Sequence, residues 1–329
     1  MRARPTTLRF RAAVVNGWPA KCAAFVALWS CFSIFRVGAA EPAPESFAYV
    51  LQADAFAKPK PLAVERFAGC DRDWIVLDAV YDGETPWERA DLDAIRRGRA
   101  GRKVLAYISI GEAEEYRPYW RKEWGASGKL SAAAPAWLGE ENPEWKGNYR
   151  VKYWNAEWQE LILAAVDDAM ARGFDGVYLD IVDGFQTFEQ DGPRYVDDRV
   201  NPETKQSYRR DMVDWVKAIA ARARAKNPAA LVVPQNGSQL LAQTDFLATV
   251  SAIGIEDLFT DGDRLQPGSH TREVLGHLKR MAEAQKPALL IEYPKGAARQ
   301  AMAKRRAAEN GLIWLIADRQ LATLGASGK

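Results

Sequence analysis

The stretch that decides the fold is GFDGVYLDIVDG, residues 173–184. Its apolar run is as long as a β-strand, and it carries Asp175 at its start and Asp180 and Asp183 at its end. Successive side chains of a strand point to opposite faces, so Tyr178 and Asp180 share one face and the apolar residues between them share the other. The pattern predicts a strand that packs one face on helices and presents a carboxylate at its carboxyl end.

Seven further apolar runs of strand length occur along the chain, and helical patterns separate most of them. Alternating strands and helices predict parallel pairing through right-handed crossovers. Eight strands predict an α/β fold of the (β/α)8 TIM-barrel class, with an open doubly wound sheet as the alternative. The predicted strands are residues 47–52, 74–80, 103–111, 174–180, 230–237, 251–259, 287–294 and 311–318. Helical periodicity is clearest over residues 155–173, 202–227, 270–285 and 296–310.

Length and composition are compatible with one large domain. The chain has 329 residues, of which 48% are apolar, and this is enough to bury a large core. We predict a single domain over residues 47–329, joined by a short linker, residues 41–46, to a different amino-terminal segment.

The first 40 residues have the pattern of a cleavable signal peptide. Five arginines and one lysine accompany the apolar run CAAFVALWSCFSIF, residues 22–35, and small residues suited to cleavage follow near Ala39 and Ala40. This predicts a secreted or periplasmic protein. An uncleaved anchor is the alternative, but the run is shorter than the about 20 residues of a spanning helix, so we expect no stable membrane insertion after signal removal. The bulky Trp29 disfavours lipidation at Cys31.

Charge and cysteine content narrow the class of protein. Removal of residues 1–40 would leave 39 basic and 43 acidic residues, a net charge of about −4, and we expect no nucleic-acid partner. Only Cys70 of the three cysteines would remain, so no intramolecular disulfide can form and stability must come from the core.

The ends of the predicted strands are rich in carboxylates. Working residues of a barrel lie at the carboxyl ends of its strands. In the sixth strand Ala252 and Gly254 share a face with Glu256, and these small residues leave room beneath the carboxylate. Asp180 and Glu256 therefore point into one cup, two strands apart. The full set at the strand ends is Asp78, Glu112, Asp180, Asp183, Gln235, Asn236, Glu256, Glu292 and Tyr293.

Two carboxylates that face one cup are what glycoside hydrolysis requires. One protonates the leaving oxygen, and the other attacks the anomeric carbon or activates water. Strands two apart are compatible with the separation of about 5–5.5 Å that a retaining mechanism uses. The structural alternative for any single carboxylate is a helix cap or an arginine pair. For Asp175, at the bottom of the barrel, we predict such a structural role in a turn or a cap. For Asp183, a role in substrate binding and a role in the loop structure are both open.

Crowded carboxylates have two expected consequences. The pKa of at least one should rise, which suits a general acid, and an acidic cup favours a cationic substrate such as a sugar with a free amine. We place Asp78, Glu112 and Glu292 among the candidates for its lining. The long segment between the third and fourth strands, residues 112–154, carries aromatics that either stack on sugar rings or pack the segment onto the barrel: Trp120, Trp124, Trp137, Trp145, Tyr149, Tyr153 and Trp154.

Other chemistries lack their signatures. The only histidines, His270 and His277, share a helix face without a cysteine cluster, which disfavours a zinc site or a Ser-His-Asp triad. The GxSxG and GxGxxG motifs are absent, and no loop motif supports a calcium or magnesium site. We predict no metal and no cofactor.

Three segments resemble the endo-α-1,4-polygalactosaminidase family of glycoside hydrolases, the family 114 type: VLAYISIGEAEEYRPYW at 104–120, GFDGVYLDIVDGF at 173–185 and AIGIEDLF at 252–259. The resemblance covers roughly residues 45–318. It implies a TIM barrel, endo-cleavage of α-1,4-linked galactosamine polymers, and a catalytic aspartate after the fourth strand with a glutamate later in the barrel. By motif these are Asp180 and Glu256, with the aspartate as nucleophile and the glutamate as acid/base.

The resulting hypothesis is an exported, retaining glycoside hydrolase whose partner is an amino-sugar polysaccharide. Asp180 and Glu256 would be catalytic. The predicted substrate-binding residues are Asp78, Tyr107, Glu112, Asp183, Gln235, Asn236 and Tyr293. Two alternatives stay open: a carbohydrate-binding protein that does not cut its polymer, and a hydrolase of a different amino-sugar glycan.

Overall fold

The computed structural model describes residues 43–329, which belong to one compact unit, Pro42–Lys329. The predicted signal peptide, residues 1–40, and the beginning of the predicted linker lie outside the described residues. Among residues 43–329, no helix combines the length and the apolar character needed to cross a membrane.

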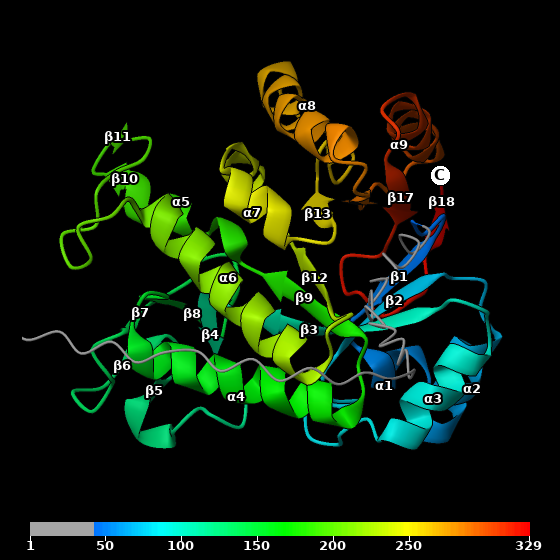
Figure 1. The fold of residues 1–329 in the computed structure, drawn as a ribbon, viewed down its shortest axis with the longest axis horizontal. Helices are drawn as coiled ribbons and strands as arrows, with labels where there is room; N and C mark the ends of the chain where they lie inside the picture. Colours follow the sequence, from blue (N-terminus) through cyan, green and yellow to red (C-terminus); the bar gives the residue numbers. More distant parts are fainter. Residues whose placement is uncertain (1–42) are drawn as a thin grey trace, which may run out of the picture. The chain divides into compact units, whose positions relative to one another are not determined.

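Each of the eight predicted strand segments contains a strand, and the fold is TIM-barrel-like (Figure 1). The strands run parallel in two ladders, β1-β2-β3-β9-β12 and β13-β16-β17. A single parallel bridge between Gln235 and Gly254 joins the ladders. The strands are β1 Phe47–Val50, β2 Trp74–Asp78, β3 Lys103–Ser109, β9 Gly176–Asp180, β12 Leu231–Pro234, β13 Ile253–Glu256, β16 Ala288–Glu292 and β17 Ile313–Ile316.

A side chain links the first and last of these strands. The carboxyl-terminal strand β18, Ala326–Gly328, pairs antiparallel with β17. The Ser327 hydroxyl accepts a hydrogen bond from the Phe47 N–H at 3.0 Å and donates to the Trp314 carbonyl at 2.8 Å. Within residues 43–329, β1 and β17 share no backbone ladder, so this serine joins the two edges of the sheet instead.

Strand parity divides the core into an inner and an outer cluster. The outer cluster packs strand residues such as Val177 and Leu179 against the helices. The inner cluster gathers residues of the opposite parity from seven of the eight strands, as predicted for Tyr178 on β9. Its members are Phe47, Tyr49, Trp74, Val76, Leu105, Tyr107, Tyr178, Val233, Ala252, Leu289, Ile291, Tyr293, Ile313, Leu315 and Ala317.

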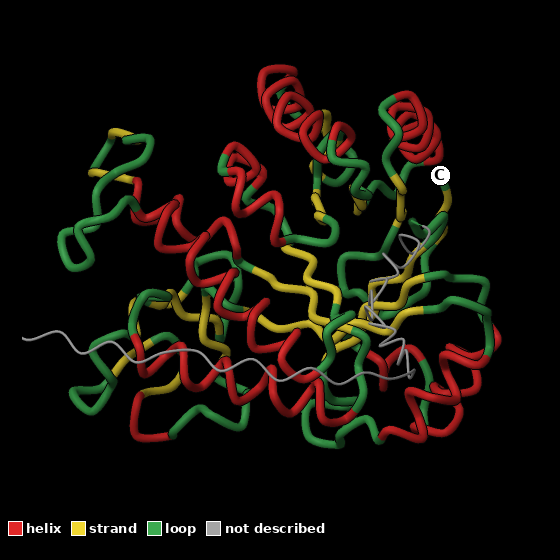
Figure 2. The backbone as a smooth tube through the Cα atoms, viewed as in Figure 1, coloured by secondary structure: helices red, strands yellow, loops and turns green. Residues whose placement is uncertain are grey.

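Helices surround the strands (Figure 2). The four helices predicted from periodicity are α4, α6, α8 and α9. The described helices are α1 Ala53–Phe56, α2 Lys60–Gly69, α3 Arg89–Arg97, α4 Ala156–Arg172, α5 Phe185–Glu189, α6 Tyr208–Lys226, α7 Thr244–Thr249, α8 Gly268–Glu283 and α9 Ala297–Glu309. Short 3₁₀ turns are η1 Lys122–Trp124, η2 Val182–Gly184 and η3 Ser238–Ala242.

Helix α6 begins six residues later than its periodicity predicted. Ser207 caps it by accepting a hydrogen bond from the Arg210 N–H at 3.1 Å. The preceding residues form a turn whose Asn201 and Thr204 side chains both donate to Asp211 Oδ2, at 2.7 and 2.8 Å. These polar bonds give the turn an alternative to helical hydrogen bonding.

The segment between β3 and α4 forms its own small sheet. Its strands pair antiparallel in the order β4-β8-β7 and are β4 Glu112–Glu114, β7 Leu138–Glu141 and β8 Asn148–Val151.

Three two-stranded hairpins lie in loops of the described chain. They are β5 Gly125–Ala126 with β6 Lys129–Leu130, β10 Gln190–Asp191 with β11 Arg194–Tyr195, and β14 Thr260–Asp261 with β15 Arg264–Leu265.

Candidate active site

Asp180 ends β9 and accepts a hydrogen bond on each carboxylate oxygen. The Tyr107 hydroxyl donates to Oδ2 at 2.8 Å, and the backbone N–H of Ile181 donates to Oδ1 at 2.8 Å. Both donors favour the ionised carboxylate. Strand parity thus places Asp180 on the inner face with Tyr107 of the neighbouring strand. In the register of β3 and β9, Tyr107 pairs with Tyr178, and Ser109, two residues on, pairs with Asp180.

The residue after Asp180 is held in an unusual backbone conformation. Ile181 has φ of 56°, in the left-handed region that β-branched residues rarely occupy. Its carbonyl oxygen lies so close to Gly111 that a Cβ added there would sit 2.2 Å from it. The strain turns the Ile181 N–H back onto Asp180, an arrangement found at functional sites.

Glu256 ends β13 in a similar environment. The Tyr293 hydroxyl donates to Glu256 Oε1, and the Glu256 N–H donates to Asn236 Oδ1 at 3.1 Å. Asn236 and Asp257, which follow the ends of β12 and β13, have φ of 61° and 50°. Left-handed residues therefore follow three strand ends around the cup.

The space predicted beneath Glu256 is filled by two polar side chains. A Cβ on Gly254 would lie 1.9 Å from the Tyr178 hydroxyl and 2.3 Å from Gln235 Oε1. Tyr178 donates to Gln235 Oε1, and Gln235 is fully buried. The amide nitrogen of Gln235 has no hydrogen-bond partner among the described residues, yet the amide lowers the pKa of nearby Glu256. Any side chain at position 254 would clash with Tyr178 and Gln235, so this position requires a glycine.

The two carboxyl groups interact electrostatically. Burial, and then the charge of Glu256, raises the pKa of Asp180. Burial also raises the pKa of Glu256, and the hydrogen bond from Tyr293 and the nearby Gln235 amide oppose this effect. Like-charged buried groups cannot both ionise easily, so the pair retains a proton toward neutral pH. One group can give a proton while the other carries charge.

Both carboxylates open into a cavity of about 910 Å³, called here the main cavity. Five of the seven predicted binding residues line it, and so do several acidic residues that the sequence did not single out. The predicted residues are Tyr107, Glu112, Asp183, Asn236 and Tyr293. The additional acidic residues are Glu114, Glu144, Asp257 and Asp261. Arg150, Lys146 and Arg319 are the basic residues of the lining.

The two predicted substrate-binding carboxylates in this lining, Asp183 and Glu112, also have raised pKa values. Burial raises the pKa of Asp183 to about 7, with smaller contributions from the charges of Glu256 and Glu112. Burial also raises the pKa of Glu112, against hydrogen bonds from the amides of Asn142 and Asn148. Asp183 accepts no hydrogen bond from another described side chain, so its carboxylate is available to a ligand.

The other two predicted binding residues lie outside the lining of the main cavity. Asp78 is tied to Arg117, whose Nη2 lies 2.8 Å from Asp78 Oδ2, and Gln235 is buried below the pair. Glu292, a weaker candidate, accepts hydrogen bonds from the backbone N–H groups of Phe259 and Thr260 and thus holds the loop after β13. The sequence could not distinguish these structural roles from substrate binding. Alternation along a strand predicts the face on which a carboxylate lies but not the groups that it contacts.

Asp175 has the structural role expected of it. Its Oδ2 accepts a hydrogen bond from the Val104 N–H at 2.8 Å and lies 3.3 Å from the Arg96 guanidinium. These contacts tie the start of β9 to β3 and α3.

The aromatics between β3 and α4 mostly pack. Trp124, Trp137, Tyr149 and Tyr153 are buried, and Trp120 and Trp154 pack against the outer cluster. Trp145 differs, because it is 53% exposed and lines the main cavity. Tyr116, which sequence reasoning missed, is 58% exposed at the same rim and donates to Glu114. Among the aromatics of residues 112–154, these two line the main cavity.

Arg319 is another residue that the sequence left unnoticed. Its guanidinium lies 4.1 Å from the centre of the Tyr293 ring and 2.8 Å from Asp257. It therefore holds the tyrosine that donates to Glu256. No sequence signal identifies it, since it lies in the loop after β17, 63 residues beyond the glutamate. Within residues 43–329, no cluster of histidine, cysteine and acidic side chains is arranged to hold a metal ion.

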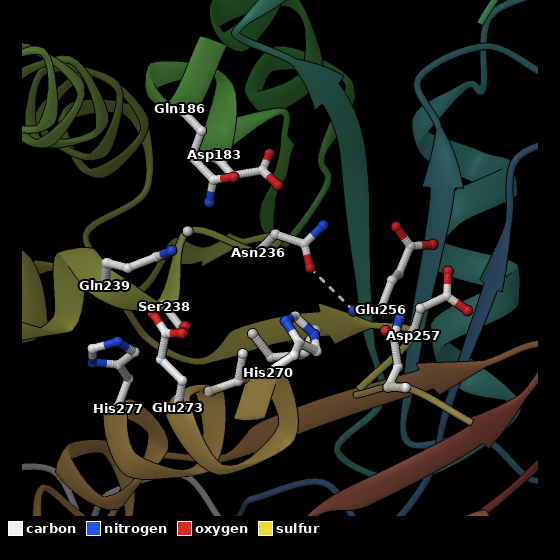
Figure 3. Close-up of a pocket in the computed structure, with 14 residues that line it drawn as sticks. Asp183, Gln186, Asn236, Ser238, Gln239, Glu256, Asp257, His270, Glu273 and His277 are labelled. Atoms are coloured by element: carbon white, nitrogen blue, oxygen red, sulfur yellow. Dashed lines mark hydrogen bonds between the residues drawn. The ribbon is translucent and has the colours of Figure 1, made fainter. Parts of the chain in front are cut away.

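A smaller hollow of about 270 Å³ adjoins the main cavity, and Figure 3 shows its lining. It is called here the side hollow. Its walls come mainly from α8, η3, η2 and α5. Its lining residues are Asp183, Gln186, Asn236, Gly237, Ser238, Gln239, Ile255, Glu256, Asp257, Gln266, His270, Glu273, Val274 and His277.

Comparison with known proteins gives this geometry a family context. Residues 37–328 match the model of glycoside-hydrolase family GH114. An uncharacterized protein of Deinococcus radiodurans is 37% identical over 248 residues, which are 75% of this chain and 73% of the relative.

Two solved structures share the fold at low sequence identity. The glycoside hydrolase domain of PelA from Pseudomonas aeruginosa superposes with a TM-score of 0.59 at 19% identity, covering 87% of this chain and 99% of that domain. Ega3 of Aspergillus fumigatus, solved in complex with galactosamine, gives a TM-score of 0.62 at 19% identity, covering 88% of this chain and 97% of that one. At such identity the likeness concerns the fold rather than the substrate.

Proposed function

Because this chain belongs to glycoside-hydrolase family GH114 and is a glycoside hydrolase, we propose that it cleaves galactosamine-containing exopolysaccharide internally, at α-1,4 bonds, by a retaining mechanism. The observation that carries this proposal is the pair of electrostatically coupled carboxylates, Asp180 and Glu256, in one acidic cavity.

The hydrogen bonds support a division of roles between the pair. Both oxygens of Asp180 accept donors, which favours its ionised form, whereas Glu256 accepts from Tyr293 on Oε1 only. Burial raises the pKa of Asp180 and acts against this assignment. The two donors contact the Asp180 carboxylate directly and stabilise its charge. We therefore assign Asp180 as nucleophile and Glu256 as acid/base.

The reaction then has two balanced steps. Asp180 forms a bond to the anomeric carbon as the glycosidic C–O bond breaks, and the proton of Glu256 passes to the leaving oxygen. A water molecule next attacks the same carbon, its proton passes to the Glu256 carboxylate, and the bond to Asp180 breaks. Both groups return to their starting protonation states, with the anomeric configuration retained.

The charge of the main cavity supports an amino-sugar substrate. Its carboxylates outnumber its basic side chains, and a free amine is cationic at neutral pH. The galactosamine bound in the Ega3 structure is consistent with this choice. Trp145 and Tyr116 supply the apolar faces on which a sugar ring can stack. Glu112, Asp183 and Asn236 supply polar contacts.

The remaining parts of the proposal concern the closed barrel and export. The Ser327 link between β1 and β17 supports a closed eight-stranded barrel. The signal-like pattern of residues 1–40 supports a secreted or periplasmic location.

The test is to incubate the mature protein with deacetylated and acetylated galactosamine and glucosamine polymers and to follow new reducing ends and product masses. Asp180→Asn and Glu256→Gln should each lower kcat by at least about 10³-fold on the cleaved polymer, since each removes an obligatory step. Their circular dichroism and Tm should show folded protein. Folded variants with full activity would exclude this pair, and an inverted anomeric product by NMR would exclude the retaining mechanism.

A further inference from the structure

The side hollow communicates with the main cavity at the proposed site of bond cleavage. The two spaces share Asp183, Gln186, Asn236, Glu256 and Asp257 as lining residues. Asp180 lines only the main cavity. A chain that occupies both spaces must therefore pass Glu256, the proposed acid/base.

Six polar side chains of the side hollow have no hydrogen-bond or ion-pair partner within residues 43–329. Gln186, Gln239, Gln266, His270 and His277 form no side-chain hydrogen bond or ion pair with any residue in the described range 43–329, and the same holds for Glu273. Figure 3 shows the labelled members of this set, which are Gln186, Gln239, His270, Glu273 and His277, around one space, with Gln186 opposite the histidines of α8. Unpaired amides and imidazoles can both donate and accept, which suits the hydroxyl groups of a sugar.

One face of α8 supplies the floor of this space. His270, Glu273 and His277 follow one another at helical spacing, three and four residues apart. They include both histidines of the chain. None of the three belongs to the buried residues of α8, which are Thr271, Leu278 and Met281, so their polar groups remain accessible.

The ionisable side chains of the side hollow are mostly acidic. Its lining holds the carboxylates of Asp183, Glu256, Asp257 and Glu273 and contains no lysine or arginine. Burial lowers the pKa of His277, and nearby Arg280 and Arg209 act in the same direction against Glu273. A neutral His277 adds no positive charge to this acidic lining.

We propose that the side hollow is a binding subsite for one amino-sugar ring of the polymer, next to the scissile bond, with the free amine near Glu273 and the hydroxyls on Gln239 and His277. Its volume, at the lower end of ligand pockets of about 300–1,000 Å³, suits a single ring. The inference rests on the proposed function and assigns α8 as the wall that recognises the sugar beyond the cleavage point.

The experiment separates binding from cleavage. Asp180→Asn protein, whose altered residue lies outside the side hollow, is titrated by calorimetry with galactosamine oligosaccharides of increasing length. Addition of Glu273→Gln should weaken binding of the longer oligosaccharides about tenfold, as expected for a lost hydrogen bond to a charged group, and should leave the shortest ones unchanged. Gln239→Ala should weaken the same long oligosaccharides.

Glu283→Gln is the matched control, because Glu283 is an exposed residue of the same helix outside the lining of the side hollow. Fully N-acetylated oligosaccharides should bind the Glu273→Gln and Glu283→Gln proteins alike. If Glu273→Gln and Gln239→Ala weaken no oligosaccharide more than the control does, the subsite is refuted even where the active enzyme cleaves the polymer. If the parent protein binds the oligosaccharides with this dependence but wild type leaves the polymer uncut, the subsite stands and the proposed cleavage fails.

Discussion

At the scale of single residues, each proposed catalytic carboxylate accepts a hydrogen bond from its own tyrosine hydroxyl. Tyr107 donates to Asp180 and Tyr293 donates to Glu256, and each bond lowers the pKa of its own carboxyl group. Loss of either hydroxyl should raise that pKa further. A nucleophile must be ionised and a general acid must be protonated. Loss of the Tyr107 hydroxyl and loss of the Tyr293 hydroxyl should therefore affect opposite limbs of the pH profile of activity.

We predict that Tyr107→Phe moves the acidic limb of the pH profile of kcat/KM to higher pH, and that Tyr293→Phe moves the basic limb to higher pH. Each shift should be about one pH unit, equivalent to about 1.4 kcal/mol. Steady-state kinetics from pH 4 to 9 measure both limbs. The opposite pattern would exchange the roles of Asp180 and Glu256.

The contact between Gly111 and Ile181 positions the end of β9 at the scale of elements. Ala at position 111 would bring its Cβ to 2.2 Å from the Ile181 carbonyl oxygen and displace the N–H that holds Asp180. A shift of about 1 Å at a catalytic group can cost about 100-fold in rate.

Gly111→Ala should therefore lower kcat about 100-fold and destabilise the fold by about 1–3 kcal/mol through overpacking. Chemical denaturation and kinetics measure the two effects separately. Gly276→Ala is the control, because no atom lies within 4 Å of its added Cβ in the middle of α8; it should stabilise by about 0.5–1 kcal/mol. A folded Gly111→Ala enzyme with normal kcat would show that this contact does not position Asp180.

Arg117 joins the small sheet between β3 and α4 to the end of β2. Its guanidinium contacts Asp78 at 2.8 Å and Glu114 at 2.5 Å, and the arginine is only 14% exposed. Removing it would leave two poorly solvated carboxylates without their cation.

Arg117→Met should destabilise the protein by about 3–5 kcal/mol, as expected when a buried ion pair loses one partner. Arg194→Met is the comparison, since Arg194 is exposed on β11 and forms no ion pair within the described residues; its effect should stay within about 0.5 kcal/mol. Urea denaturation measures both. Equal effects would mean that Arg117 does not anchor the small sheet.

The acidic cup affects stability at the scale of the whole molecule. Burial raises the pKa values of Asp180, Glu256, Asp183 and Glu292, the last two to about 7. Between the unfolded pKa near 4 and these values the folded state binds more protons than the unfolded state. The carboxyls therefore contribute stability at low pH that is lost as pH rises through their folded pKa values.

Asp183→Asn should accordingly raise Tm by several degrees at pH 8 and by less at pH 5, because an amide carries no charge to desolvate. Differential scanning calorimetry at the two pH values measures the difference. Asp198→Asn, at an exposed residue, should shift Tm equally at both. A pH-independent effect of Asp183→Asn would contradict the raised pKa.

Much of the arrangement follows from the sequence alone. Apolar runs of strand length located the eight strands, and alternation along the strands placed Asp180 and Glu256 on the inner face, because both patterns are local properties. Periodicity located α4, α6, α8 and α9, although the polar turn held by Asp211 delayed the start of α6. The family resemblance agreed with the GH114 match.

Only the tertiary structure decided which polar groups meet. It paired Asp78 with Arg117 and turned Glu292 toward the loop after β13. It also placed Arg319 against the ring of Tyr293, the tyrosine that donates to Glu256. It also separated Trp145 from the packed aromatics and assembled the side hollow mainly from α8, η3, η2 and α5. These contacts join residues far apart in the chain, so they depend on packing and not on local pattern. The sequence determined which carboxylates face inward, and the fold determined which of them remain available to a substrate.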